Sequence, residues 1–304
     1  MNGESMQNVN YYLNQVSQIK NTLHEIMIEA SHALNEFYLD PKTWDVSLKK
    51  DASPVTTADH HCHQLLTEQL TATGLNIPII SEENTEEETA AFKANPPEVY
   101  WLIDPLDGTS GFVKGTGHYA INLALIYNNT PIAGWITWPR TGLLCWAYGF
   151  QSFTSGCSSF DVEQPESIEH LVALKKQHPL VIYSSSTQNV RKLKVVESLK
   201  PIITDEAIVN LGAAVKFCAL FQGYGDVYPR LGSTCLWDLA AGQVLLKARG
   251  GDIFRLDGTV MDYDFKSGVI NTAFVAVADT KLKELPAIMS ALNQVHQQLK
   301  LKKD

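Results

Sequence analysis

The sequence lacks the features that mark membrane-spanning, exported or repetitive proteins. No apolar run approaches the ~18 residues of a membrane span, and no basic segment followed by an apolar core begins the chain. No internal repeat or low-complexity segment is present. We therefore expect a cytoplasmic protein, with a peripheral association at the inner membrane as the alternative. Disorder is expected only in the first ten residues and in the final LKKD.

Cysteine is scarce, and clustered basic residues are missing. The cysteines form no CxxC pair, so we expect buried free thiols in a reducing compartment; they are Cys62, Cys145, Cys157, Cys218 and Cys235. The formal net charge is −9 and no arginine-rich stripe stands out, so nucleic acid is not an expected partner. An anionic small molecule remains compatible with this charge, because bound cations can offset acidic side chains.

The 304 residues, 45% of them hydrophobic, are enough for a large core in one or two domains. The composition changes across residues 152–166, which predicts an N-terminal domain over 1–155 and a C-terminal domain over 156–304. The first half has an α+β pattern and the second half an α/β pattern. In the second half, predicted strands at 180–185, 207–211, 225–230, 251–256 and 273–278 alternate with helices at 187–199, 213–224, 237–251 and 280–300.

The first half is expected to combine helices with an antiparallel sheet. Apolar residues at helical spacing predict one long amphipathic helix over 11–38. A hairpin is predicted over 46–59, followed by a helix that starts at Thr57 or Asp59 and continues to about Thr73. The remaining predictions are strands at 77–81 and 99–103, a loop or loose helix at 84–97, and an antiparallel meander over 119–149.

The most informative stretch is WLIDPLDGT at residues 101–109, where an apolar strand meets two aspartates. Pro105 suits the second position of a β-turn, which would point Asp104 and Asp107 the same way. The Leu106 carbonyl would face the same space. Two carboxylates and a carbonyl are hard oxygen ligands of the kind that Mg²⁺ takes. The alternative is an ordinary strand-to-helix loop with capping aspartates.

The residues after this turn suggest an anion site beside the metals. Gly108 permits a close approach of the backbone, and Thr109 is predicted to cap a helix. The free N–H groups of that helix would bind an anion.

Further acids stand where other apolar elements begin or end. Glu82 and Glu83 follow a strand, Asp238 opens an apolar helix, and Asp59 precedes another. Taken singly, each is more often a helix cap or a solvated charge, but together they fit the element ends where sites collect on α/β scaffolds. A carboxylate-rich ligand set favours Mg²⁺ over Zn²⁺. Clustered Mg²⁺ ions suit phosphate ester hydrolysis, with one metal helping to generate hydroxide and another stabilising the leaving oxygen.

The cluster His60-His61-x-His63 could suggest zinc. Without cysteine partners or a HExxH pattern, we expect these histidines to be surface residues of a helix.

Four blocks carry a resemblance to a known family: SPVTTAD, IPIISEE, WLIDPLDGT and WDLAAGQVLLKARGG. Their order and spacing resemble the inositol monophosphatase-like superfamily of lithium-sensitive, Mg²⁺-dependent phosphatases. The resemblance implies a layered αβαβα sandwich and two or three Mg²⁺ ions. It implies metal binding by Glu82, Asp104, the Leu106 carbonyl, Asp107 and Asp238, and catalytic roles for Asp59, Glu82 and Thr109. In the family, the residues that match Asp59 and Thr109 position the attacking water, and the role of the acid matching Glu83 is secondary.

Within the superfamily, DPLDGT, GAAVKFC (212–218) and DVYPR (226–230) resemble the CysQ-type 3'(2'),5'-bisphosphate nucleotidases. These enzymes remove the 3'-phosphate of adenosine 3',5'-bisphosphate and release AMP. Arg230 falls near a position where inositol phosphatases carry a carboxylate, and a guanidinium there suits a second phosphate. The alternative for Arg230 is a surface ion pair. The predicted substrate-binding residues are Leu106, Asp107, Gly108, Thr109, Lys216, Arg230 and Asp238.

Two departures from the nucleotidase pattern affect only the predicted leaving group. Ser110-Gly111-Phe112 stands where Lys-Glu-Phe is usual, although Lys114 is near, and SSSTQN (184–189) replaces the family's Ser-Arg. An inositol monophosphatase or another sugar-phosphate phosphatase is therefore the alternative function. A non-catalytic nucleotide- or metal-binding protein is a third, disfavoured because every expected ligand is present. The expected partner is a phosphorylated nucleotide, and the protein is expected to be a monomer or homodimer.

Overall fold

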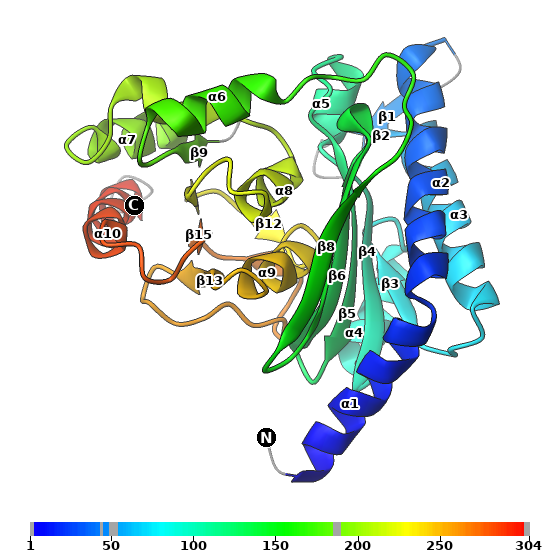
Figure 1. The fold of residues 1–304 in the computed structure, drawn as a ribbon. Coiled ribbons are helices and arrows are strands. Elements are labelled where there is room, and N and C mark those ends of the chain that lie inside the picture. Colours follow the sequence, from blue (N-terminus) through cyan, green and yellow to red (C-terminus); the bar gives the residue numbers. More distant parts are fainter. Residues whose placement is uncertain (1–2, 43–44, 49–53, 185–189, 301–304) are drawn as a thin grey trace.

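Helices and two β-sheets alternate as five layers in the computed structural model, which describes residues 3–42, 45–48, 54–184 and 190–300. Figure 1 shows α1, α2 and α3 on one face of a large sheet, α8 and α9 between the two sheets, and α7 and α10 beyond the second sheet. The predicted layered αβαβα sandwich is confirmed. Within the described residues, no helix combines the length and the hydropathy that a membrane crossing requires.

The helices cover both outer faces and the middle layer. Their bounds are α1 (Gly3–Gln18), α2 (Lys20–Leu39), α3 (Thr57–Ala72), α4 (Glu86–Ala94), α5 (Thr109–Val113), α6 (Glu169–Gln177), α7 (Val190–Leu199), α8 (Val215–Phe221), α9 (Ala240–Lys247) and α10 (Leu285–Lys300), with short 3-10 turns η1 (Pro139–Thr141) and η2 (Asp205–Ala207).

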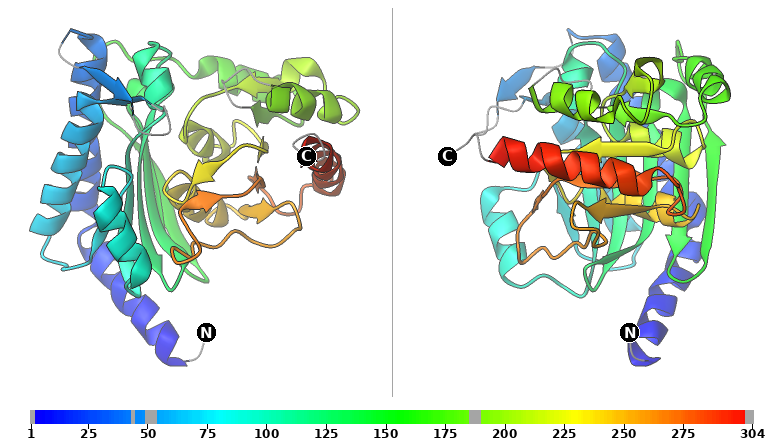
Figure 2. Two further views of the ribbon diagram at one scale, coloured as in Figure 1. Left: turned by 180° about the vertical axis from the view of Figure 1, so that it is seen from behind. Right: turned by 90° about the vertical axis from the view of Figure 1, so that its left-hand side faces the viewer.

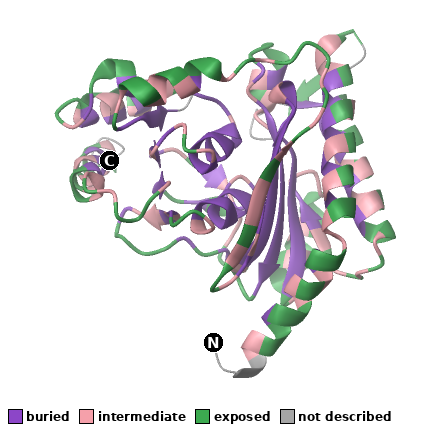
Figure 3. Cartoon of the chain, viewed as in Figure 1, coloured by how far each residue is buried: buried purple, intermediate pink, exposed green. Residues whose placement is uncertain are grey.

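The larger sheet has the strand order β3-β4-β5-β6-β7-β8, in which β3 is parallel to β4 and the other neighbours are antiparallel. Helices pack on both of its faces, so its central strands are continuous apolar runs rather than alternating ones; every residue of β5 is buried, and Figure 3 shows the buried strands between the helical layers. The strands are β3 (Ile79–Ser81), β4 (Val99–Asp107), β5 (Ala120–Tyr127), β6 (Thr130–Trp138), β7 (Leu143–Gly149) and β8 (Phe153–Ser159).

The second sheet has the order β10-β9-β11-β15-β13. Its inner face meets α9, which also contacts β6 of the first sheet. Its outer face is covered by α10, which Figure 2 shows lying across the strands, with Ile288, Leu292 and Val295 buried. The strands are β9 (Ile182–Ser184), β10 (Ile208–Asn210), β11 (Val227–Arg230), β13 (Asp252–Arg255) and β15 (Phe274–Val277); two-stranded pairs are formed by β1 (Val46–Leu48) with β2 (Pro54–Thr56) and β12 (Thr234–Cys235) with β14 (Ile270–Asn271).

Most predicted elements are present, and the meander over 119–149 is confirmed as β5, β6 and β7. The hairpin over 46–59 is present as β1 and β2, although its residues 49–53 lie outside the described part. Residues 185–189, which include the end of the predicted strand 180–185 and the start of the predicted helix 187–199, and the tail 301–304 also lie outside it. The stretch 84–97 contains a regular helix, α4, which begins with a capping box between Thr85 and Glu88.

Three predictions at the N-terminal side of the fold are wrong. The helix over 11–38 is interrupted at Ile19, whose ψ of 11° ends α1 before α2 begins, and Figure 1 shows α1 continuing beyond the end of the sheet. The first ten residues are not disordered where they are described, because α1 starts at Gly3 and buries Val9. The apolar strand at 99–103 does not stop there but continues to Asp107.

The predicted domain boundary at residue 155 falls inside β8, because residues 153–159 form the edge strand of the first sheet. Serine and glycine in that stretch look like a linker by composition, but the backbone pairs with β7 along its whole length. A division into two domains stays a prediction, and the sheet moves its boundary past Ser159.

Candidate active site

A β-bulge in β4 positions the two aspartates of the DPLDGT stretch. Asp104 lies opposite Asn122 of β5, whereas Asp107 lies opposite Ala120, so three steps on β4 match two on β5. Pro105 is tolerated because a bulge leaves a residue without a ladder partner. The predicted isolated turn is therefore an irregular continuation of the strand, and the pairing of β4 with β3 and β5 holds Asp104 in place.

Three carboxylates from separate elements meet beside this bulge. Ligand oxygens of Glu82, Asp104 and Asp238 all lie within 4.8 Å of one another. Glu82 follows β3 and is held by its backbone N–H, which donates to the Ile103 carbonyl at 3.1 Å. Asp238 precedes α9 rather than lying inside it, since α9 begins at Ala240, and Asp238 Oδ2 accepts a hydrogen bond from Cys235 N at 2.8 Å.

The carboxylate cluster fits a hard cation. Asp104 is 1% exposed, and its Oδ2 is buried without a hydrogen-bond partner among the residues that the structure describes. An orphaned buried carboxylate oxygen is costly unless a cation or a proton joins it. A metal bound by Glu82, Asp104 and Asp238 would satisfy that oxygen with the ligand type that Mg²⁺ prefers.

The protonation of the cluster supports this interpretation. Burial raises the pKa of Asp104 well above its usual range, and the neighbouring charge of Glu82 adds to the shift. Burial and the charge of Asp107 together raise the pKa of Asp238 to about 8. Without a cation, the cluster therefore retains protons that free carboxyl groups would release.

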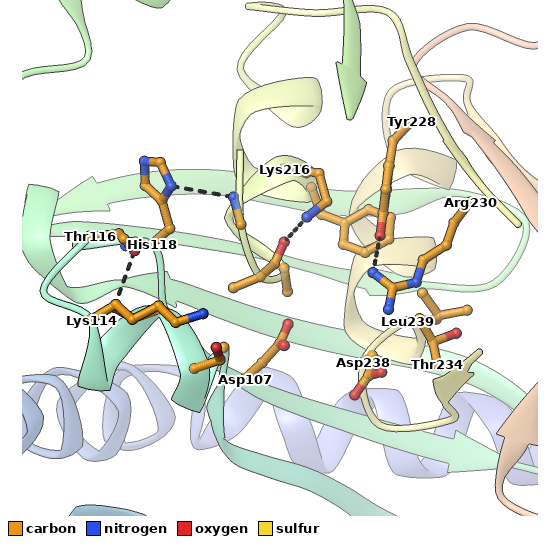
Figure 4. A pocket seen from close by; sticks show the side chains of 17 residues that line it. Asp107, Lys114, Thr116, His118, Lys216, Tyr228, Arg230, Thr234, Asp238 and Leu239 are labelled. Carbon is orange, nitrogen blue, oxygen red and sulfur yellow. Dashed lines mark hydrogen bonds between the residues drawn. The ribbon is translucent and has the colours of Figure 1, made fainter. Parts of the chain in front are cut away.

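Asp107 lies beside the cluster and faces a different set of groups. Burial raises its pKa, while the positive charge of Lys216 and a hydrogen bond from the Ala214 backbone lower it. Figure 4 shows Asp107 and Asp238 on one side of a pocket, with Lys216 and Arg230 opposite. The predicted metal ligation by Asp107 and by the Leu106 carbonyl stays a prediction.

Asp59 and Thr109 form a second polar pair next to the bulge. Thr109 Oγ1 lies 3.1 Å from both Asp59 Oδ1 and the Leu106 carbonyl oxygen. Asp59 is 2% exposed, and its Oδ2 accepts hydrogen bonds from the backbone N–H and hydroxyl of Thr56 at 2.7 and 2.6 Å. Asp59 is the third residue of α3, and it forms a capping box with Thr56, the N-cap of that helix. The sequence interpretation identified Asp59 and Thr109 but missed Thr56, which stands in the quoted block SPVTTAD.

Gly108, not Thr109, is the N-cap of α5. Gly108 has φ +91°, and a Cβ there would lie 2.7 Å from the His118 carbonyl oxygen and 2.8 Å from Ala213 Cβ. The predicted close approach at Gly108 is thus present, and no side chain fits in this space. The helix that follows has only five residues, and its first residue, Thr109, uses its hydroxyl on Asp59 instead of on the helix end.

A pocket of about 270 Å³ opens beside these residues, lined from both halves of the chain. The β4–α5 corner contributes Asp107, Gly108 and Ser110, and Lys114 lines the same wall (Figure 4). Lys114 therefore brings a positive charge to the place where Ser110-Gly111 departs from the family pattern. His118, which also lines the pocket, was missed by the sequence interpretation because nothing in its local sequence marks it.

Lys216 is buried among backbone carbonyls. It is 2% exposed, and its Nζ donates to the carbonyls of Leu211 at 3.0 Å and Ala213 at 2.6 Å. Its ammonium also lies 4.5 Å from the centre of the Tyr228 ring. Burial lowers the pKa of Lys216 to about 7, although Asp107 opposes the shift. Its predicted substrate binding stays a prediction, since two of its three N–H donors already hold the backbone.

Arg230 has donors to spare in the pocket. Its Nη2 donates to the Ser233 carbonyl at 2.9 Å, and its Nη1 lies 3.4 Å from the Tyr228 hydroxyl. Its Nε is buried and has no hydrogen-bond partner within the described part of the chain. Arg230 is not a surface ion pair, because its hydrogen-bond partners among the described residues are a carbonyl and a phenol. Each Nη carries two N–H groups and uses one of them in these contacts, so Nη1 and Nη2 each keep one donor for an anion.

The histidines of α3 lie outside the carboxylate cluster, and His60 and His61 are exposed whereas His63 is half-buried. His60 is largely exposed and lies 4.0 Å from Glu83. His63 Nδ1 is 3.0 Å from Ser81 Oγ. Neither belongs to the group of Glu82, Asp104 and Asp238.

We expect Mg²⁺ to raise the thermal unfolding midpoint, and to raise it more at pH 8 than at pH 5. In the metal-free protein, the raised pKa values of Asp104 and Asp238 mean that the folded state binds more protons than the unfolded chain. The stabilisation by these bound protons is fully present below the ordinary carboxyl pKa of ~4. It is lost as the pH rises through the raised pKa values of the folded state. A cation bound only by the folded state offsets that loss. Scanning fluorimetry with chelator or Mg²⁺ at each pH measures the difference; a shift that is absent at millimolar Mg²⁺ would contradict the metal assignment.

Comparison with known proteins finds one family throughout. A family model described as the inositol monophosphatase family matches residues 13–297. The 3'(2'),5'-bisphosphate nucleotidase CysQ of Buchnera aphidicola subsp. Acyrthosiphon pisum is 30% identical over 278 residues, which cover 90% of this chain and 100% of that protein. The protein of the same name from Aggregatibacter actinomycetemcomitans is 33% identical over 257 residues, covering 83% and 89%.

Solved structures share the fold. CysQ from Bacteroides thetaiotaomicron superposes with a TM-score of 0.68 at 24% identity, covering 86% of this chain and 98% of that one. The IMPase of Thermotoga maritima has a TM-score of 0.69 at 19% identity, covering 90% and 96%. At these identities the structural likeness concerns the fold alone.

Proposed function

Because the chain belongs to the inositol monophosphatase family, we propose that it is a Mg²⁺-dependent phosphatase acting on adenosine 3',5'-bisphosphate. The reaction removes the 3'-phosphate and releases AMP and inorganic phosphate. Relatives at 30% and 33% identity carry the name 3'(2'),5'-bisphosphate nucleotidase CysQ, which supports this substrate class.

The observation that carries the proposal is that acidic side chains and Arg230 lie on opposite sides of the same pocket. Asp107 and Asp238 line one side, and the guanidinium of Arg230 lies on the other (Figure 4). A substrate with two phosphates suits this arrangement, because one phosphate can lie at the metal ligands while the other receives the guanidinium. A polyol has no group that would pair with a buried guanidinium equally well.

Different residues of the chain have different roles around the scissile phosphate. When bound at Glu82, Asp104 and Asp238, divalent cations supply Lewis-acid charge that lowers the pKa of water and stabilises a leaving oxygen. The Thr109 hydroxyl donates its proton towards Asp59 Oδ1 or the Leu106 carbonyl, which leaves its lone pairs to accept a hydrogen bond from the attacking water. Thr56 fixes Asp59 from behind, so the pair is held before substrate arrives.

The finer parts of the proposal follow from the same site. We infer two or three Mg²⁺ ions, with Asp107 and the Leu106 carbonyl completing the ligand set of Glu82, Asp104 and Asp238. Gly108 and Thr109 receive the scissile phosphate, and the C-terminal half supplies Asp238 together with specificity through Lys216 and Arg230. The enzyme acts in the cytoplasm as a monomer or homodimer.

A second candidate function is the hydrolysis of inositol monophosphate or another sugar phosphate. It is motivated by Ser110-Gly111, which line the pocket where a basic residue was expected. Lys114 lines the same wall and supplies a positive charge there, which argues against this second function.

We expect the protein to release phosphate from adenosine 3',5'-bisphosphate with a kcat/KM at least about 100-fold higher than from inositol 1-phosphate. The physical reason is that only the nucleotide carries a second phosphate for Arg230. Phosphate release is measured with both substrates side by side in saturating Mg²⁺. A preference for inositol 1-phosphate would reject the nucleotidase proposal while leaving the metal site intact, and no release from either would favour a non-catalytic protein.

A further inference from the structure

Two cysteines face each other across the outer edge of the large sheet, away from the carboxylate cluster. Cys145 of β7 and Cys157 of β8 are directly opposite in the antiparallel register. Their Sγ atoms lie 2.9 Å apart. Cys145 is fully buried, whereas Cys157 is exposed. The prediction that all cysteines are buried is therefore wrong for Cys157, because β8 is an edge strand with one side open to solvent, and Cys235 is only partly buried.

The antiparallel register of this pair predicts a backbone spacing that a disulfide can bridge. Opposite residues of an antiparallel pair have Cα atoms about 4.5–5.5 Å apart, and disulfides need about 4.4–6.8 Å. The sulfurs must approach by only about 1 Å to reach the S–S bond length of about 2.05 Å. Side-chain rotation can supply that movement, so neither strand has to shift.

The two thiols differ in a way that assigns their roles. The hydrogen bond from Cys145 lowers the pKa of Cys157, burial opposes that effect, and the nearby charge of Arg249 lowers it further. Burial raises the pKa of Cys145 well above its usual range. Because thiolates are the reacting species, Cys157 is the nucleophile that meets a reagent from solvent, and Cys145 is the resolving thiol behind it.

We propose that Cys145 and Cys157 form a reversible intramolecular disulfide by exchange with a low-molecular-weight disulfide, at a modification site separate from the phosphatase site. The Cys157 thiolate attacks the small disulfide, forming a mixed disulfide and releasing one small thiolate. Cys145 then loses its proton, and its sulfur attacks Cys157 Sγ and displaces the second small thiolate. Two cysteine thiols are oxidised, and one small disulfide is reduced to two thiols.

This link would join the edge strand to its neighbour by a covalent bond in addition to their backbone hydrogen bonds. It ties the edge strand β8 to β7, and edge strands are otherwise held on one side only. A third thiol, Cys218 of α8, contacts Cys145 from the other side, but Cys218 is buried beneath β6 and Cys145 and has no exposed approach. The Cys145–Cys157 pair is therefore expected to form before any link to Cys218.

The test is oxidation of the full-length, Mg²⁺-loaded protein with glutathione disulfide. The thiol count after denaturation should fall from five to three, and dithiothreitol should restore it. Residues 141–174 contain no lysine or arginine, so trypsin keeps both cysteines in one peptide. Chymotryptic cleavage between them, at Trp146, Tyr148, Phe150 or Phe153, should then leave two fragments joined until reduction.

Two variants make the result specific. Cys157→Ser, an exposed substitution that leaves the core unchanged, should keep its four remaining thiols under the same treatment. Cys235→Ser is the matched control and should still lose two. Glutathione stably attached to Cys157, a Cys157-linked dimer, or chymotryptic fragments that separate without reduction would each overturn the proposal.

Discussion

Asp104→Asn is expected to lower phosphate release from adenosine 3',5'-bisphosphate by at least about 10³-fold, while the protein keeps its fold. The amide has nearly the shape of the carboxyl group but cannot carry the negative charge that holds a divalent cation. Asp104 is the buried member of the carboxylate cluster, and its Oδ2 has no other partner in the described part of the chain. Losing metal assistance removes several kcal/mol of transition-state stabilisation, which corresponds to this rate factor.

The same variant should be more stable than the parent protein in the presence of a chelator. Three carboxylates near one another, with Asp104 buried, destabilise the metal-free folded state because they either repel one another or must retain protons, and Asp104→Asn replaces one of them with a neutral amide. Its unfolding midpoint in chelator should rise, and its Mg²⁺-induced shift should disappear. Opposite changes in activity and metal-free stability separate a metal ligand from a residue that merely supports the fold.

The matched control is Asp161→Asn, which neutralises an exposed aspartate after β8. It should change neither activity nor the Mg²⁺ response. If Asp104→Asn retained more than about a tenth of the parent rate, the metal-assisted mechanism would be wrong. If the parent protein bound Mg²⁺ but released no phosphate at all, the chain would be a binding protein that has kept the fold.

The acids of this cluster could be predicted from sequence because each stands at the end of an apolar element. Glu82 follows β3, Asp104 lies at the bulge of β4, and Asp238 precedes α9. Apolar runs reveal strands and helices, and a charged residue directly beyond such a run is conspicuous. What the sequence could not show is that these ends converge, since that depends on the β3–β4 pairing and on how the second half of the chain packs.

Local geometry was harder to predict than the presence of elements. The pattern of an apolar strand followed by Asp-Pro suggested a stop, but the pairing with β5 carries β4 through Asp107 by a bulge. The change of composition across residues 152–166 suggested a domain boundary, yet backbone pairing makes residues 153–159 an edge strand. In both cases, hydrogen bonds to a neighbouring strand outweigh local propensity, and no single-sequence pattern contains that neighbour.

The roles of the basic residues depended most on tertiary contacts. Lys216 was predicted to bind substrate, but its ammonium is held by the carbonyls of Leu211 and Ala213. Lys114 was noted only as being near the missing basic residue, and the structure shows that it lines the pocket. Arg230 is the basic residue whose predicted position and available donors agree, so it offers the sharpest test of the substrate.

Arg230→Met is expected to lower kcat/KM for adenosine 3',5'-bisphosphate by about 100-fold. For adenosine 3'-monophosphate, kcat/KM should stay within about 3-fold of the parent value. The two substrates share the scissile 3'-phosphate and the nucleoside, and only the first has a 5'-phosphate. Removing the charged partner of a desolvated phosphate costs a few kcal/mol. Methionine retains much of the side-chain length, so the change chiefly removes the guanidinium and its donors.

Measuring kcat/KM of the parent protein and of Arg230→Met with both nucleotides gives four values that form a thermodynamic cycle. The ratio of the two losses isolates the interaction of Arg230 with the 5'-phosphate. Arg230→Lys should recover part of the loss, because an ammonium keeps the charge but not the paired N–H geometry. Arg230 also holds the Ser233 carbonyl at 2.9 Å, so its removal could disturb residues 231–233. A disturbance of that segment would lower kcat/KM for both nucleotides alike. Equal losses would therefore show that Arg230 holds this loop and does not bind the 5'-phosphate.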